Sequence, residues 1–213
     1  MAQAKLEKLP ALKDSSVPAA VRAALDAGGS RLVRPDGSVL CEVWLRKSLP
    51  VGRVAAAKGA AYPEMSESTL LGVISFPNGG KDFRGQAIKP GFYTMRYELL
   101  PEDGNHLGVA PTRDFVLLLA AGADNDPDAQ YDFAQLVKLS AQAAGTNHPA
   151  PFVLLQPALS PFNAGSEKGG PPTGDLPRTY QNPDGFQVFA GAIQTDGGKN
   201  VPIALVVKGQ AEQ

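Results

Sequence analysis

The chain contains two histidines, His106 and His148, and an imidazole can bind a metal ion or transfer a proton near neutral pH. Each follows an asparagine, in Gly-Asn-His-Leu-Gly and in Thr-Asn-His-Pro, and each falls in an expected loop, where functional residues concentrate. If the two loops meet, the imidazoles together with Asp103 or Asp114 could hold a transition metal through nitrogen and oxygen ligands. The alternative is that both rings hydrogen-bond backbone carbonyls within turns.

Three alternating aspartates, Asp124, Asp126 and Asp128, have the spacing of the first ligands of a calcium loop. The rest of that pattern is missing, because Ala129 stands where the loop requires glycine and Gln135 where it requires glutamate. An acidic turn that complements the dipole of a following helix is the alternative. The sequence also has no nucleophile elbow, phosphate-binding glycine loop or HExxH motif. A non-catalytic protein without a cofactor is therefore expected.

A possible ligand-binding face carries Trp44 between Glu42 and Arg46 at the period-two spacing of a strand. Arg96 lies on the polar side of a second expected strand. An exposed tryptophan framed by charges suits stacking on a sugar or contact with a protein partner. The alternative is that a helix or the irregular segment 157–185 covers Trp44.

The turn-rich connection after residue 100 adds further candidate ligand-binding residues, namely Asn105, His106, Arg113 and Asp114. Polar side chains in a loop on a rigid scaffold are suited to recognition. Arg113 and Asp114 could alternatively form an ion pair that closes the loop.

The elements that must position these residues are mostly strands. Residues 92–99 alternate, and the side expected to face the core carries Tyr93, Met95, Tyr97 and Leu99. Residues 116–119 are apolar on both sides, which predicts a central strand covered on each face. Further strands are expected at 30–34, 38–47, 69–76, 152–156, 186–194 and 201–208.

Two short helices complete the expected elements, one over 17–27 with Ser16 as its cap and one over 133–144 between Asp132 and Gly145. Regularly spaced turns between short strands predict an all-β antiparallel sandwich of jelly-roll type with these helices at its periphery. Residues 1–16 are expected to form an N-terminal arm, and 17–213 a single domain. Cys41 falls on the apolar side of its strand, where a buried structural thiol is expected.

The formal net charge is −1, so no global field recruits nucleic acid, and binding to nucleic acid is not expected. No apolar run reaches the roughly 20 residues of a transmembrane helix. The small-x-small form of Ala2-Gln3-Ala4 suggests a trimmed export signal, hence a periplasmic or secreted protein, with the cytoplasm as the alternative.

Several parts of the sequence resemble a group of uncharacterised, exported bacterial proteins: residues 41–47, 89–97, 104–108 together with 111–115, and 144–149. The Lys-Pro-Gly-x-Tyr-Thr piece that begins at Lys89 is also similar to a strand of small bacterial β-sandwich domains of unknown function, of the DUF2911 type. Neither resemblance implies an established activity.

The expected function is an exported, non-catalytic binding or structural domain, which contacts a glycan or an envelope protein through the Trp44 face or the loop around His106. The alternative is a metal-binding protein or metal-dependent enzyme that uses His106 and His148.

Overall fold

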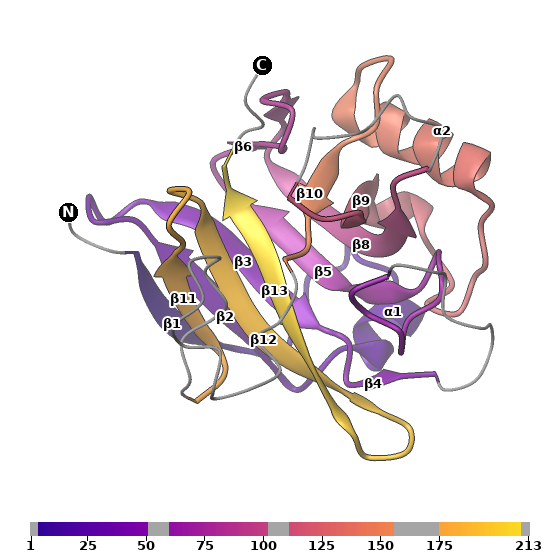
Figure 1. Ribbon diagram of the computed structural model, residues 1–213, viewed down its shortest axis with the longest axis horizontal. Coiled ribbons are helices and arrows are strands. Elements are labelled where there is room, and N and C mark those ends of the chain that lie inside the picture. Colours follow the sequence, from indigo (N-terminus) through magenta and orange to yellow (C-terminus); the bar gives the residue numbers. More distant parts are fainter. Residues whose placement is uncertain (1–3, 51–59, 102–110, 156–174, 210–213) are drawn as a thin grey trace.

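A computed structural model describes residues 4–50, 60–101, 111–155 and 175–209 of the chain. Two antiparallel sheets dominate it (Figure 1). The larger sheet has seven strands, which neighbour one another in chain order. They are β1 (Lys5–Pro10), β2 (Gly28–Val33), β3 (Val39–Leu45), β5 (Leu70–Phe76), β8 (Gly91–Leu99), β9 (Asp114–Ala120) and β10 (Pro151–Val153).

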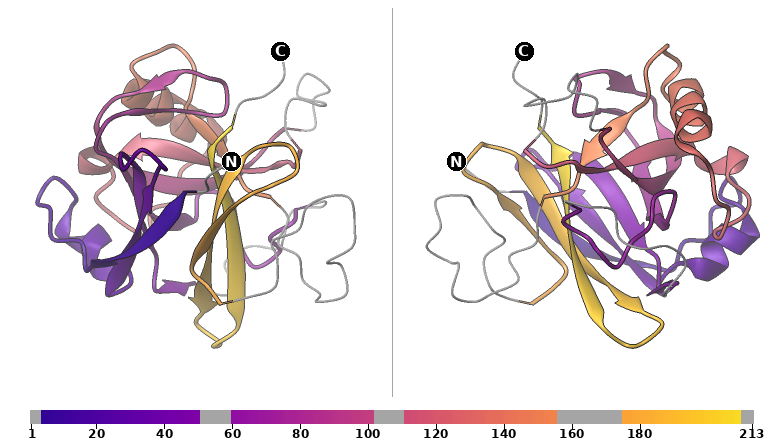
Figure 2. Two further views of the ribbon diagram at one scale, coloured as in Figure 1. Left: turned by 90° about the vertical axis from the view of Figure 1, so that its left-hand side faces the viewer. Right: turned by 45° about the vertical axis from the view of Figure 1, so that its right-hand side comes forward.

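The smaller sheet packs across the larger one (Figure 2). It contains β11 (Arg178–Gln181), β12 (Gln187–Thr195) and β13 (Asn200–Lys208), and β4 (Ser48–Leu49) pairs with the end of β12. A separate hairpin joins β6 (Gly80–Lys81) to β7 (Ala87–Ile88). The predicted all-β antiparallel sandwich with two peripheral helices is confirmed.

The main core lies between the two sheets. Strand β8 contributes the predicted face of Tyr93, Met95, Tyr97 and Leu99, and β3 contributes Cys41, which is fully buried. The smaller sheet adds Phe189 and Leu205 from its inner side. The alternation read from the sequence therefore identified the core face correctly.

Two helices and a short 3-10 helix, η1 (Ala121–Ala123), lie against the outer face of the larger sheet. α1 (Ala19–Ala24) places Val21 over Trp44, and α2 (Phe133–Ala144) places Leu136 over β9. β9 is thus covered on both faces, as predicted. Asp132 and Gln135 form a reciprocal capping box at the start of α2. None of the described helices has the length and apolar character needed to cross a bilayer.

The two sheets are joined along one side only. There Leu154 bridges to Leu205, and the N–H of Leu155 donates to the carbonyl of Ala204 at 2.8 Å. On the opposite side, β1 pairs only with β2 and β11 pairs only with β12 within the described residues. Within the described residues, backbone hydrogen bonds therefore close the sandwich at β10 and β13, whereas β1 and β11 lie near each other without pairing, and this side is called the open side.

Three expectations about these elements are wrong. Residues 5–10 of the expected arm form the edge strand β1, whose charges remain exposed to water. The outer side of β8 does not face solvent. Its polar residues Thr94, Arg96 and Glu98 are buried beneath the helices and the segment that connects β9 to α2. β11 lies within the segment expected to be an irregular loop.

Candidate functional site

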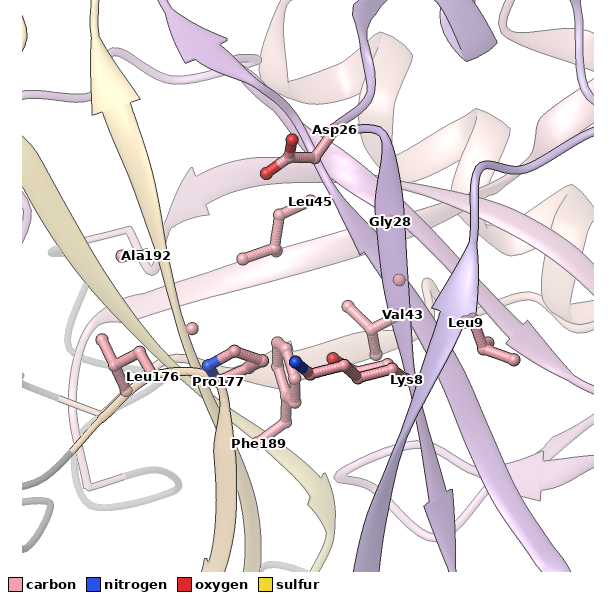
Figure 3. Close-up of a pocket in the computed structure, with 13 residues that line it drawn as sticks. Lys8, Leu9, Asp26, Gly28, Val43, Leu45, Leu176, Pro177, Phe189 and Ala192 are labelled. Carbon is pink, nitrogen blue, oxygen red and sulfur yellow. The ribbon is translucent and has the colours of Figure 1, made fainter.

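A cleft of about 360 Å³ lies on the open side of the sandwich, where β1, β2 and β3 face the end of β11 and the middle of β12 (Figure 3). Five separate parts of the chain form its lining. The lining residues are Lys8, Leu9, Asp26, Gly28, Gly29, Ser30, Val43, Leu45, Leu176, Pro177, Phe189, Gly191 and Ala192.

The cleft exists because the inner side of β2 carries very small residues here. Gly28 and Ser30 alternate with the buried core residue Leu32, so they point toward the smaller sheet. A Cβ atom added to Gly28 would meet one non-adjacent heavy atom within 4 Å, the carbonyl oxygen of Leu9 at 3.3 Å. Apart from this one tight backbone contact, the space around a side chain at position 28 is open.

The floor of the cleft is apolar. Val43 and Phe189 are buried in the main core, and Leu45 packs against that core from its edge. At the rim, Leu176 keeps 39% of its surface exposed and is one of two large exposed apolar side chains in the described part of the chain. An apolar ligand would contact this floor and would remove the exposed side chain of Leu176 from water.

Two opposite charges stand at opposite ends of the cleft, Lys8 on β1 and Asp26 just before β2 (Figure 3). Lys8 is exposed and is paired across the strands with Ser30. The N–H of Asp26 donates to the carbonyl of Leu45 at 2.9 Å, and its Oδ1 accepts from the N–H of Ala27 at 3.0 Å. Neither Lys8 nor Asp26 takes part in an ion pair among the described residues.

Trp44 does not form an exposed binding face. Its side chain is 5% exposed, packs with Val21 and Leu25 beneath α1, and donates from Nε1 to the carbonyl of Pro10 at 2.9 Å. Its ring lies beside Phe92, with centroids 6.3 Å apart. The expectation of a stacking surface fails because the first helix covers this side of β3.

Arg96 is also buried rather than available to a ligand. Its guanidinium binds both carboxylate oxygens of Asp124, at 2.8 and 2.7 Å, and neither side chain is exposed. It donates as well to the carbonyls of Ser68, Asp126 and Ala129. This network holds the connection between β9 and α2 against the larger sheet.

Asp114 lies at the buried start of β9 and accepts a hydrogen bond from the hydroxyl of Tyr97 at 2.5 Å. Both of its carboxylate oxygens also accept from the N–H of Ala61. Burial and the adjacent carboxylate raise the pKa of Tyr97. Arg113 donates to the carbonyl of Leu100 at 2.9 Å. The two neighbouring residues therefore have separate structural roles.

The expected histidine pair is tested only in part. Asn105 and His106 lie outside the described residues, as does Asp103. His148 is exposed in the turn after α2, near the Ala120 end of β9, whereas the connection that carries His106 leaves from the Asp114 end. No group of three potential metal ligands occurs among the described residues.

The three alternating aspartates do not converge as calcium ligands. Asp124 binds Arg96, Asp128 binds Arg46 at 2.7 Å, and Oδ1 of Asp126 accepts from the N–H of Asp128. The acidic residues instead attach the connection before α2 to two strands of the larger sheet.

A further acidic contact involves Glu98, which is 1% exposed. Burial and a hydrogen bond with the carboxyl group of Glu67 raise the pKa of Glu98 to about 8. Glu98 therefore carries its proton at neutral pH, which removes the repulsion between the two groups.

Sequence reasoning missed Lys8, Asp26 and Phe189 as site residues. Lys8 was assigned to the arm, and Asp26 and Phe189 carry no motif. The usable signal was the pair Gly28-Gly29, since glycines inside a strand mark a close approach or a gap in side-chain packing.

The protein is an all-β sandwich with a cleft between its sheets. No protein-family model matches the chain, and neither curated proteins nor solved structures yield a match.

Proposed function

We propose that this protein is a non-catalytic binding domain that takes a small ligand with an apolar body and a charged group into the cleft between its sheets. The observation that supports the proposal is the combination of an apolar floor with two unpaired charges around a cleft of about 360 Å³. Ligand sites are commonly concave and apolar, with a few polar groups that fix orientation.

The lining favours binding over catalysis. Among the described lining residues, Lys8 and Asp26 are the only titratable side chains and stand at opposite ends. The one hydroxyl among them, on Ser30, has no histidine or carboxylate beside it in this lining. Nucleophilic and general acid–base catalysis need such groups within hydrogen-bond reach of each other.

The lining also favours an apolar ligand over the glycan that the sequence suggested. A sugar brings many hydroxyl groups, and each one that loses water without a new partner opposes binding. The floor offers Val43, Leu45 and Phe189, none of which can hydrogen-bond through its side chain.

The test uses anilinonaphthalene sulfonate, an anionic apolar dye whose fluorescence rises in an apolar site. We expect saturable binding by the native protein and loss of binding in Gly28→Leu, because the added side chain would occupy the cleft. The matched control is Gly197→Leu, since Gly197 lies in an exposed turn where an added Cβ would meet only the hydroxyl of Thr195, at 3.7 Å.

Thermal melting of both variants shows whether each remains folded, because the dye also binds loosely packed states. Equal dye binding by a folded Gly28→Leu variant and the native protein would contradict the proposed function.

A further inference from the structure

We infer that the ligand is a short apolar peptide of two or three residues with free ends, whose carboxylate binds Lys8 and whose ammonium group binds Asp26. This inference rests on the proposed function of the cleft. It follows from the charges at the two ends, the separation between them and the apolar surface that lies between.

The strand register gives the separation of the two charged residues. Lys8 pairs with Ser30, which pairs with Val43, whereas Asp26 bonds to the backbone of Leu45, two residues further along β3. The offset is roughly 7 Å along the strands and about 5 Å, one strand spacing, across them. The two backbone positions are therefore roughly 9 Å apart.

A peptide of two or three residues fits that separation, because an extended chain spans about 3.3 to 3.6 Å per residue. A single amino acid carries both charges on one carbon atom and cannot bring them to both ends of the cleft. The apolar side chains of a short peptide would contact the floor of Val43 and Phe189 and would cover the exposed Leu176 between the charged ends.

Charge complementarity distinguishes this ligand from a fatty acid. A fatty acid would satisfy Lys8, but it would leave the carboxylate of Asp26 without a partner beside an apolar chain.

A longer peptide that adds a strand to β1 is also disfavoured. This edge carries Lys5, Glu7 and Lys8 and ends at Pro10, and charged residues and proline are features that prevent strand addition.

The experiment measures binding of the tripeptide Leu-Ala-Leu by calorimetry, beside its N-acetylated form, its C-amidated form and decanoate. We expect acetylation and amidation each to weaken binding by roughly 10-fold or more, since each removes a charged hydrogen-bonding end. Decanoate should bind more weakly than the free tripeptide.

Two variants test which residue binds each end of the peptide. Asp26→Asn should bind the free and the acetylated tripeptide equally, and Lys8→Met should bind the free and the amidated tripeptide equally. Lys5→Met, on the same edge strand, is the control and should behave as the native protein.

Equal binding of the free and blocked tripeptides, or no tripeptide binding at all, would overturn the inference. If the dye or decanoate still binds and Gly28→Leu abolishes that binding, the proposed function stands and only the ligand class is wrong. If Gly28→Leu leaves the binding of dye, decanoate and tripeptide unchanged, the proposed function itself fails.

Discussion

Two pairs of opposite charges occupy contrasting places in this sandwich. Arg96 and Asp124 are completely buried, bind each other through two hydrogen bonds, and are surrounded by carbonyls to which the guanidinium donates. Lys8 and Asp26 are exposed at the ends of a cleft and have no ion-pair partner in the described part of the chain. The residue types are similar, but the surroundings differ completely.

The difference shows how a charged residue that stabilises the fold can be distinguished from one that is available to a ligand. A buried charge must have its partners within the protein, because desolvation without compensation costs several kcal/mol. A charge at the edge of an apolar hollow remains hydrated until a ligand arrives. The sequence assigned ligand binding to Arg96, whereas the structure makes Lys8 the better candidate.

The largest expected effect comes from breaking the buried pair. Arg96→Met leaves Asp124 buried without its partner, and we expect the free energy of unfolding to fall by about 3 to 5 kcal/mol. Urea denaturation measures the change. The double variant Arg96→Met/Asp124→Leu should recover part of the loss, because it removes the stranded charge. A loss of less than about 1 kcal/mol in the single variant would contradict a structural role.

Another buried titratable group, Glu98 on β8, makes stability depend on pH. Its pKa is raised to about 8 from the ordinary value of 4.5, so the folded state retains a proton that the unfolded state releases. The free energy of unfolding should therefore fall as pH rises from about 4.5 to about 8, by on the order of 2 to 4 kcal/mol.

Glu98→Gln tests this dependence, since glutamine keeps a hydrogen-bonding group but does not titrate. Urea denaturation at a series of pH values should give a flatter curve for the variant across that window. A curve with the native slope would show that another group causes the dependence.

Smaller effects on stability are expected when a hydroxyl group is added to the main core or removed from the cleft lining. Cys41→Ser places a hydroxyl on a fully buried apolar face, and we expect a loss of about 1 to 3 kcal/mol. Ser30→Ala removes a hydroxyl from the cleft lining and should change stability by no more than about 0.5 kcal/mol. Equal melting temperatures for Cys41→Ser and the native protein would contradict the burial of this thiol.

The smallest expected effect is that of the cleft charges themselves. Lys8→Met and Asp26→Asn should each change the free energy of unfolding by no more than about 0.5 kcal/mol, because both side chains are exposed and make no ion pair in the described residues. Destabilisation comparable to that of Arg96→Met would remove the contrast and assign these charges to the fold.

Local pattern was a reliable guide to single elements. The Asp36-Gly37 turn joins β2 to β3 as predicted, and α2 begins after Asp132 and ends before Gly145, where φ is +69°. The core side of β8 was also correct, because alternation directly reports which face of a strand is apolar.

Pattern was a poor guide to what covers the other face. The polar sides of β3 and β8 were read as solvent-facing, but Trp44 lies under α1 and Arg96 lies under the connection before α2. Polar residues on one face of a strand indicate that this face is exposed to water only if no other element packs against it. Arg96 is polar and buried because Asp124 and several carbonyls, 28 or more residues away in the sequence, satisfy it.

By itself, then, the sequence determined most of the long strands, their turns, the caps of α2 and the apolar face of the sandwich, since each depends on residues that are near neighbours along the chain. The strands β1 and β11 were missed. Only the tertiary structure decided which charges are enclosed and where the cleft lies. The cleft forms because β1, β2, β3 and β12 come together at the side of the sandwich that no strand closes. The pair Gly28-Gly29 indicates a gap in side-chain packing, but no local pattern shows which distant segments surround that gap.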